Sequence, residues 1–284
     1  MLDFAWRALL SLAAFVYLEL KRPAPLLNLR LLSRRNFGLG TCANFVFGFS
    51  MFGWIYLIPQ YLSRMQGYSS QEIGGVMVWL GLPQLFLIPF IPKVLQRIQA
   101  RTLVITGYSL FIGGSLLAMF LSDNFSGPEF LSSSLVRAFA QAMTMAPLSA
   151  IAIAGIEPQF AGSASALFNA TRNMGGAVGI ALLQTILTKR EQFHSNILTS
   201  QVSLLVPATR QRLDSLVDYF MAHGASDRGF AYREAVVATG RAVRHQAFIL
   251  GFSDTIIIQS AVLGLGLAAV LFLRGATQSA GGAK

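Results

Sequence analysis

Charged residues are scarce in this chain of 284 residues: only 12% are Asp, Glu, Lys or Arg, which is about half the share usual in soluble domains. Hydrophobic residues make up 54% of the chain. A soluble domain of this size cannot hide so much apolar surface in one core, whereas a lipid bilayer can cover it. The composition therefore places the chain among the integral membrane proteins.

Cysteine is almost absent, and so are the common catalytic motifs. The single cysteine, Cys42, lies in an apolar run, so no disulfide can form within the chain and no cysteine-based metal site is indicated. The patterns GxxxxGK[ST], HExxH and GxSxG are missing. The three histidines, His194, His223 and His245, are spaced too widely to suggest a metal site. The sequence thus excludes a P-loop ATPase, supports no enzyme and predicts no cofactor.

Long apolar runs are what the sequence has in abundance. A transmembrane helix needs about 20 predominantly apolar residues. Candidate runs cover 2–20, 37–62, 71–92, 102–122, 130–153, 163–187 and 248–273. None of them alternates apolar and polar residues with the period of a strand. We predict an all-α integral membrane protein with about seven transmembrane helices.

Lysine and arginine segregate to one side of these runs. If residue 1 lies outside the membrane, the short outer loops hold only Arg64, and the inner segments hold Lys21, Arg22, Arg30, Arg34, Arg35, Lys93, Arg97, Arg101, Arg274 and Lys284. The positive-inside rule favours this orientation. It also explains the net charge of +10 better than a nucleic-acid-binding face does, so no nucleic-acid partner is expected.

The stretch 189–247 differs from the rest of the chain because it is polar. Pro207 is placed to open a helix and Gly224 to close it. A second helix over 230–246 is expected to run into the last span. Two readings stay open: the segment docks a partner or lies on the membrane surface, or it is a cap that packs on the bundle. The first helix would have one apolar face, made of Leu213, Leu216, Val217, Phe220 and Met221.

Six amide side chains lie inside the predicted spans, where polar groups are costly and need water or partners. The run 102–122 carries no amide or charge at all. This division predicts a water-filled cavity that is lined by some helices and backed by others. The candidate substrate-cavity residues are Asn44, Gln60, Gln84, Gln141, Asn169 and Gln184.

Two opposite charges, Arg137 and Asp254, lie at a similar depth in their spans. Each is roughly 10 Å below the predicted outer surface at the rise of a helix. They are candidates for a gate or a proton-linked ion pair. The alternative is a static pair near the headgroups, or an arginine that snorkels outward. Arg172, near the inner end of its span, is a third gating candidate, with a positive-inside anchor as its alternative.

Glycines are placed for close helix packing in the run 163–187. Gly175 and Gly179 form a GxxxG pattern with Gly176 beside them. Such a pattern lets two membrane helices approach closely.

Several segments together resemble one family. The runs PAPLLNLRLLSRRNFGLG (23–40) and IPQYLSRMQGYSSQEIGG (58–75) look like the entry to the second half of the EmrB/QacA-type fourteen-span drug:proton antiporters of the major facilitator superfamily. The stretch ASALFNATRNMGGAVGIALLQTIL (164–187) resembles their thirteenth span. One departure is the loop 89–101, which lacks the Gly and Asp of the family's motif there.

The resemblance covers spans eight to fourteen, that is, a six-helix C-terminal bundle plus one linking helix. It implies a linking helix at 1–22, a cytoplasmic loop at 23–36, a bundle at 37–188, a periplasmic or extracellular helical loop at 189–247, a last span at 248–273 and a cytoplasmic tail at 274–284.

The resemblance further implies a multi-pass protein of the plasma (inner) membrane that acts in multidrug efflux by drug:proton antiport, or the C-terminal half of one, inactive alone. The implied partners are a small amphipathic substrate, the lipid bilayer, an N-terminal half and a periplasmic adaptor protein. The alternative from another class is a membrane scaffold or remnant that does not transport and whose outer loop 189–247 binds a partner.

Overall fold

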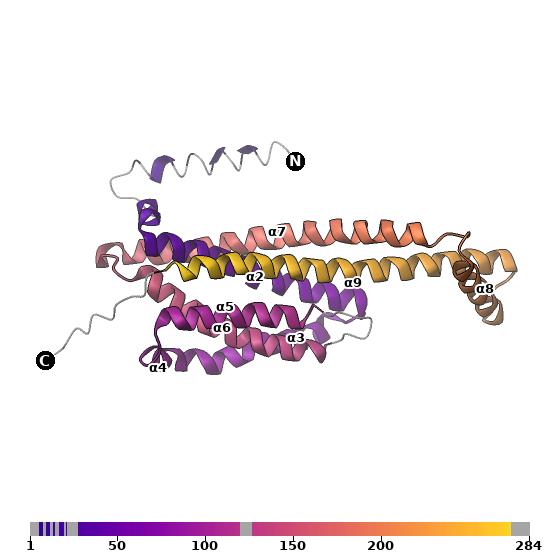
Figure 1. The fold of residues 1–284 in the computed structure, drawn as a ribbon, viewed down its shortest axis with the longest axis horizontal. Coiled ribbons are helices and arrows are strands. Elements are labelled where there is room, and N and C mark those ends of the chain that lie inside the picture. The colour runs from indigo at the N-terminus through magenta and orange to yellow at the C-terminus, as the bar shows by residue number, and fades with distance from the viewer. Residues whose placement is uncertain are drawn as a thin grey trace.

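The computed structural model describes residues 28–119 and 127–273, together with a few residues between 6 and 21. All regular secondary structure in these residues is helical (Figure 1). The predicted all-α class is therefore confirmed. The predicted linking helix 1–22, of which only scattered residues are described, and the tail 274–284 lie outside this account.

Eight α-helices and three short 3-10 turns follow one another in the described residues. The α-helices are α2 (Arg35–Met65), α3 (Ser70–Leu87), α4 (Ile91–Leu95), α5 (Ala100–Leu117), α6 (Glu129–Ile153), α7 (Ala161–Gln201), α8 (Pro207–Ala222) and α9 (Arg228–Leu271). The 3-10 turns are η1 (Leu29–Ser33), η2 (Ile88–Phe90) and η3 (Pro158–Phe160).

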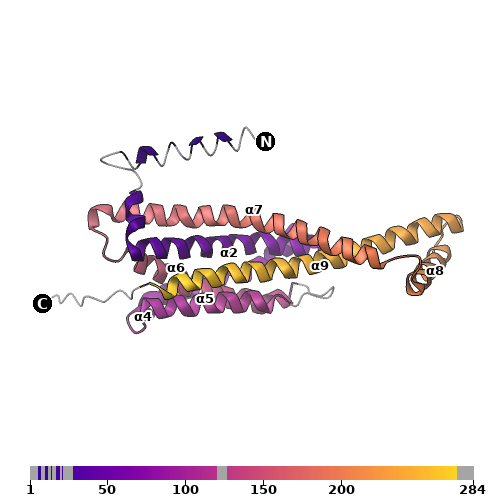
Figure 2. The same cartoon turned by 45° about the horizontal axis from the view of Figure 1, so that its top comes forward.

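Five helical segments are long and apolar enough to cross a membrane: α2, α3 continued through α4, α5, α6 and α9. The predicted span 163–187 lies in α7, which is not among them because Asn, Arg and Gly lower its apolar content. It nevertheless runs beside α2 in both views (Figures 1 and 2). A count based on apolarity alone therefore misses α7, which is one of the helices of the bundle.

Local signals set the ends of these helices. Ser69 and Glu72 form a reciprocal capping box at the start of α3. Helix α8 begins at Pro207, and Gly224, with φ at +97°, follows its end, as the sequence predicts. The Asp227 carboxylate caps α9 by accepting a 2.8 Å hydrogen bond from the Phe230 amide.

Helix α9 ends where arginines of the predicted inner side collect. Arg101 donates to the Leu271 carbonyl at 2.5 Å, and Arg35 donates to the Phe272 carbonyl at 3.2 Å. The last carbonyls of a helix lack partners within it and attract cations. These contacts hold the starts of α2 and α5 against the end of α9.

Aromatic side chains fill the bundle. Near one end Phe47 packs against Tyr108 and Phe111, and the Tyr108 hydroxyl donates to the Ala43 carbonyl at 2.6 Å. Toward the other end Tyr61 packs edge-on against Phe130. The buried Tyr108 hydroxyl thus finds a backbone partner inside an otherwise apolar core.

Helices α2 and α7 meet at glycines. A Cβ atom at Gly175 would overlap the carbonyl oxygen of Phe45, and one at Gly179 would overlap that of Phe49. Gly48 of α2 stands in the same relation to the carbonyl of Arg172. The two backbones are therefore in contact over several turns, which fixes the position of α7 in the bundle.

Helices α7 and α9 extend well beyond the bundle and carry α8 at their far end (Figures 1 and 2). They have 41 and 44 residues, or roughly 60 and 65 Å, whereas the hydrocarbon core of a bilayer is about 30 Å thick. The predicted segment 189–247 is therefore not set apart from its neighbours: its two ends continue the spans on either side. We call residues 189–247 the hairpin.

Candidate functional site

A pocket of about 280 Å³ lies between α3, α6 and α7. Its polar side chains are Gln84 of α3, Ser149 of α6, and Asn169 and Arg172 of α7; its apolar walls include Ile88, Ile91, Met145 and Phe168. Two of the predicted cavity residues and one of the predicted gating residues thus meet in one place. We call this space the amide pocket.

A chain of hydrogen bonds joins the amide pocket to the interior. The Gln84 amide donates to the Leu80 carbonyl at 2.7 Å and to the side-chain oxygen of Gln141 at 3.1 Å. Gln141 donates in turn to the Met51 sulfur at 2.9 Å. The link ties α3, α6 and α2 together and holds Gln84 at the rim.

The α7 side of the amide pocket carries a polar pair. Arg172 donates to the Asn169 side-chain oxygen at 2.9 Å, and Asn169 donates to the Ser165 carbonyl at 3.0 Å. Asn44, which is buried, donates to the Phe168 carbonyl at 2.6 Å. Asn44 therefore does not line the amide pocket but holds the backbone at Phe168, which does.

Gln60 and Gln184 do not join this group. They follow Asn44 and Asn169 by about 16 and 15 residues on the same helices, so they lie more than about 20 Å farther along the axes. Gln60 is half-buried near the end of α2, and Gln184 is exposed on α7. Both lie outside the amide pocket, because residues on one helix share a depth only within a few turns.

Arg137 is fully buried in the bundle. Its guanidinium lies between two aromatic rings, 3.5 Å from the ring centroid of Trp54 and 4.3 Å from that of Phe111. Nη1 donates to the Ser115 hydroxyl at 2.8 Å. Nε and Nη2 have no hydrogen-bond partner among the described residues. Aromatic faces therefore stand where a carboxylate was expected.

The predicted pair between Arg137 and Asp254 is wrong for this structure. Asp254 lies 2.7 Å from His194 Nε2 and 3.7 Å from Arg190 Nε. Both partners come from the part of α7 that continues past its predicted span. Asp254 is partly exposed and faces this polar extension, whereas Arg137 faces aromatic rings in the core.

Sequence reasoning missed His194 and Arg190 as partners, because it treated everything after 188 as a separate loop. The signal was present: the two residues are four apart and so share one helix face. That face meets Asp254 once α7 continues as a helix antiparallel to α9.

The family model of the Major Facilitator Superfamily matches residues 6–180. The chain belongs to the major facilitator superfamily. It is accordingly a multi-pass protein of the plasma membrane and a member of a transporter family rather than of an enzyme family.

Curated relatives of this major facilitator chain carry export or resistance names. It is 26% identical to the colistin resistance protein EmrB of Acinetobacter baumannii over 82% of this chain and 45% of the relative. It is 28% identical to the multidrug export protein EmrB of Escherichia coli over 70% and 39%. It is 24% identical to the multidrug resistance protein Stp of Mycobacterium tuberculosis over 95% and 49%. The chain spans about half the length of these relatives.

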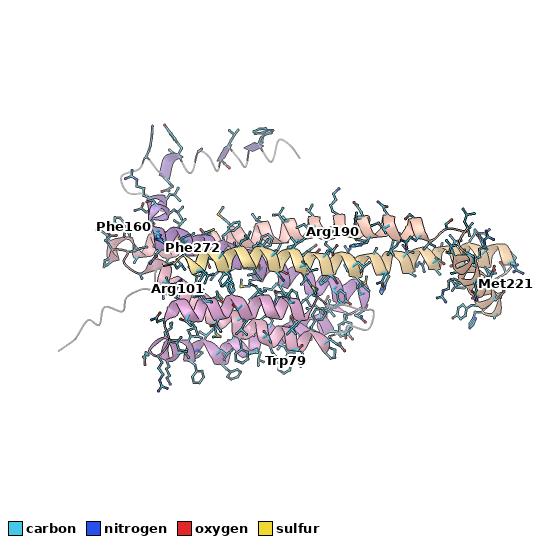
Figure 3. All side chains as sticks on the ribbon, in the orientation of Figure 1. Trp79, Arg101, Phe160, Arg190, Met221 and Phe272 are labelled. Carbon is cyan, nitrogen blue, oxygen red and sulfur yellow. The ribbon has the colours of Figure 1, made fainter. Side chains whose placement is uncertain are left out.

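One side of this major facilitator chain is open and apolar. Leu80 is the buried residue of α3, while Trp79, Leu85 and Phe86 of the same helix are 46%, 73% and 67% exposed. Figure 3 shows Trp79 at the outer edge of the bundle. Ile88 directly follows α3, lines the amide pocket and is 50% exposed, so the amide pocket borders this open side.

Proposed function

We propose that the chain is the C-terminal half of an exporter that moves small amphipathic molecules across the membrane in exchange for protons. The observation that carries the proposal is the convergence of Gln84, Asn169 and Arg172 in one pocket between apolar helices. Polar groups at membrane depth usually mark a substrate or ion path. The export and resistance names of the relatives support the same class of activity.

The lining of the amide pocket indicates the substrate chemistry. Methionine and aromatic walls adapt to apolar bodies of different shape. The Asn169 amide and the Arg172 guanidinium offer hydrogen bonds and a positive charge to an acceptor group at one end. Molecules with an apolar body and a carboxylate or other acceptor fit this arrangement.

An N-terminal half is the first proposed partner. The amide pocket, at about 280 Å³, is slightly smaller than the usual range for ligand sites. It borders the open apolar side of α3, and a transporter site generally lies between two helical repeats near the midplane. A second half placed against α3 would enlarge the pocket and cover the exposed rings.

Thiol accessibility in the chain, with Cys42→Ser as background, tests the proposed site. Asn169→Cys is expected to react with a membrane-impermeant sulfonated thiol reagent, because a substrate pocket holds water. Deoxycholate, an amphipathic carboxylate, should slow this labelling at least severalfold. Leu167→Cys, on a buried position of the same helix, should stay unreactive.

Gln184→Cys is the matched control, since it places the thiol on α7 outside the amide pocket. Deoxycholate should leave its labelling unchanged. Equal protection at both positions would mean that the molecule only coats the protein surface. An Asn169→Cys protein as unreactive as Leu167→Cys would refute a water-filled pocket, and the exporter proposal with it.

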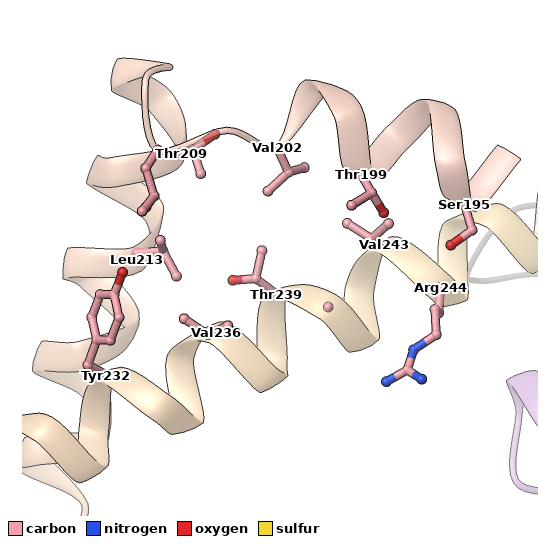
Figure 4. A pocket seen from close by; sticks show the side chains of 12 residues that line it. Ser195, Thr199, Val202, Thr209, Leu213, Tyr232, Val236, Thr239, Val243 and Arg244 are labelled. Carbon is pink, nitrogen blue, oxygen red and sulfur yellow. The ribbon is translucent and has the colours of Figure 1, made fainter.

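A periplasmic adaptor protein is the second proposed partner, at the far end of the hairpin. A hollow of about 520 Å³ lies there between α7, α8 and α9, lined by Thr199, Leu213, Tyr232 and Thr239 among others (Figure 4). The apolar side chains at this end remain open: Leu204, Leu205, Tyr219 and Met221 are 54%, 83%, 55% and 43% exposed. Figure 3 shows Met221 at the tip. Contiguous exposed apolar groups mark interaction sites.

A photocrosslinking amino acid at Leu205 tests this second partner in native membranes. It is expected to capture a protein with a periplasmic domain and a single membrane anchor. The same amino acid at Gln192, on the membrane-proximal part of the hairpin, should not capture it. Capture from both positions, or only of a second copy of this chain, would contradict the adaptor proposal.

A further inference from the structure

A second charged pocket, of about 250 Å³, lies where α2 ends beside α7 and α9. Its lining includes Arg64, Glu191, Arg241, Arg244, His245 and Phe248. Figure 4 shows the Arg244 side chain leaving α9 on the side away from Thr199 and Val243. Arg244 also lines the hollow of the hairpin, so its side chain borders both spaces. We call this second space the arginine pocket.

Positive charge in the arginine pocket is not balanced by the residues that the structure describes. Three guanidinium groups face one carboxylate, that of Glu191. In the part of the chain that the structure describes, none of these three arginines forms a salt bridge, and the nearby Asp254 is engaged by Arg190 and His194. Arg241 and Arg244 are three residues apart on one helix, a spacing at which like charges repel.

The arginine pocket lies at the boundary between the apolar bundle and the polar hairpin. Phe248 is buried in the core, and the Arg64 guanidinium lies over its ring at 5.4 Å from the centroid. On the predicted topology this is the outer face, where arginine is normally depleted. Three arginines gathered at one point of that face are therefore unusual, and a bound anion would offset their positive charge.

We propose that the arginine pocket binds a phosphate group, supplied by an outer-leaflet phospholipid headgroup or by free phosphate. Guanidinium groups match phosphate oxygens in paired hydrogen bonds. Basic pockets between membrane helices on the cytoplasmic side bind anionic lipid head groups, and the same pairing of guanidinium with phosphate can operate at the outer face. The bound anion would offset the repulsion and join the end of α2 to the base of the hairpin. The site is separate from the amide pocket, so the inference does not depend on transport.

Binding of short-chain lipids to the purified full chain, measured by native mass spectrometry, tests the proposal. Dioctanoyl phosphatidylglycerol is expected to bind, and dioctanoylglycerol, which has the same chains without phosphate, is not. The double variant Arg241→Gln with Arg244→Gln should bind the phospholipid on the order of tenfold more weakly. Arg228→Gln with Arg233→Gln removes the same charge from the same helix away from the pocket and should leave binding unchanged.

Inorganic phosphate distinguishes the two sources. If it binds as tightly as the phospholipid and competes with it, free phosphate is the ligand; if it binds far more weakly, the headgroup is. The proposal is overturned if both double variants lose binding equally, or if dioctanoylglycerol binds as well as the phospholipid. The double variant Arg241→Lys with Arg244→Lys keeps the charge and is the control for misfolding of the Gln variant. It should retain more phospholipid binding than the Gln variant.

Discussion

Arg137→Ala is expected to lower the free energy of unfolding by about 3–5 kcal/mol, the range for removing a large buried side chain. The guanidinium fills the space between the rings of Trp54 and Phe111. Truncation leaves a cavity between α2, α5 and α6 and also removes both cation–π contacts. Unfolding in mixed micelles, followed by circular dichroism, measures the change.

Two further variants at Arg137 separate shape from charge. Arg137→Met fills most of the space and removes a buried charge that no carboxylate among the described residues neutralises, so it should cost less than about 1.5 kcal/mol. Arg137→Lys keeps the charge but loses the flat group that stacks on the rings, and should cost about 2 kcal/mol. Arg97→Ala, at an exposed position, should change little. A methionine variant as unstable as the alanine variant would show that the charge itself holds the bundle together.

The sequence predicts the membrane class and the helices well, because both depend on the amount and spacing of apolar residues. The runs 37–62 and 130–153 fall within α2 and α6. The boundaries of α8 were also readable, since Pro207 and Gly224 act locally. What could not be read was the continuation of α7 past 188, where polarity rises while the backbone stays helical.

The candidate site was only partly predictable for a related reason. Polarity at membrane depth identifies Gln84 and Asn169, but not which residues share a pocket. That depends on how α7 is placed against its neighbours. The same limit explains the error at Arg137: charge complementarity favours Asp254, whereas the fold supplies aromatic rings. Aromatic partners leave no pattern in the sequence that would single out Trp54 or Phe111 from the other aromatic residues.

Gly175→Ala is expected to lower the free energy of unfolding by about 3 kcal/mol, the upper part of the range for overpacking. The added Cβ would overlap the Phe45 carbonyl oxygen, which belongs to a helix backbone and cannot rotate away as a side chain can. Helices α2 and α7 must therefore separate. Gly113→Ala is the control, because a Cβ there meets nothing within 4 Å. It should be neutral or stabilise by up to about 1 kcal/mol, as alanine favours a helix over glycine.

The same substitution links packing to the candidate site. Asn169 and Arg172 lie within two turns of Gly175, and Gly48 of α2 packs on the Arg172 carbonyl. A displaced α7 would carry both polar side chains away from Gln84 and open the amide pocket. Labelling of Asn169→Cys should then lose its protection by deoxycholate in the Gly175→Ala background while keeping it with Gly113→Ala. Unchanged protection in both backgrounds would show that the glycine contact between α2 and α7 does not set the geometry of the pocket.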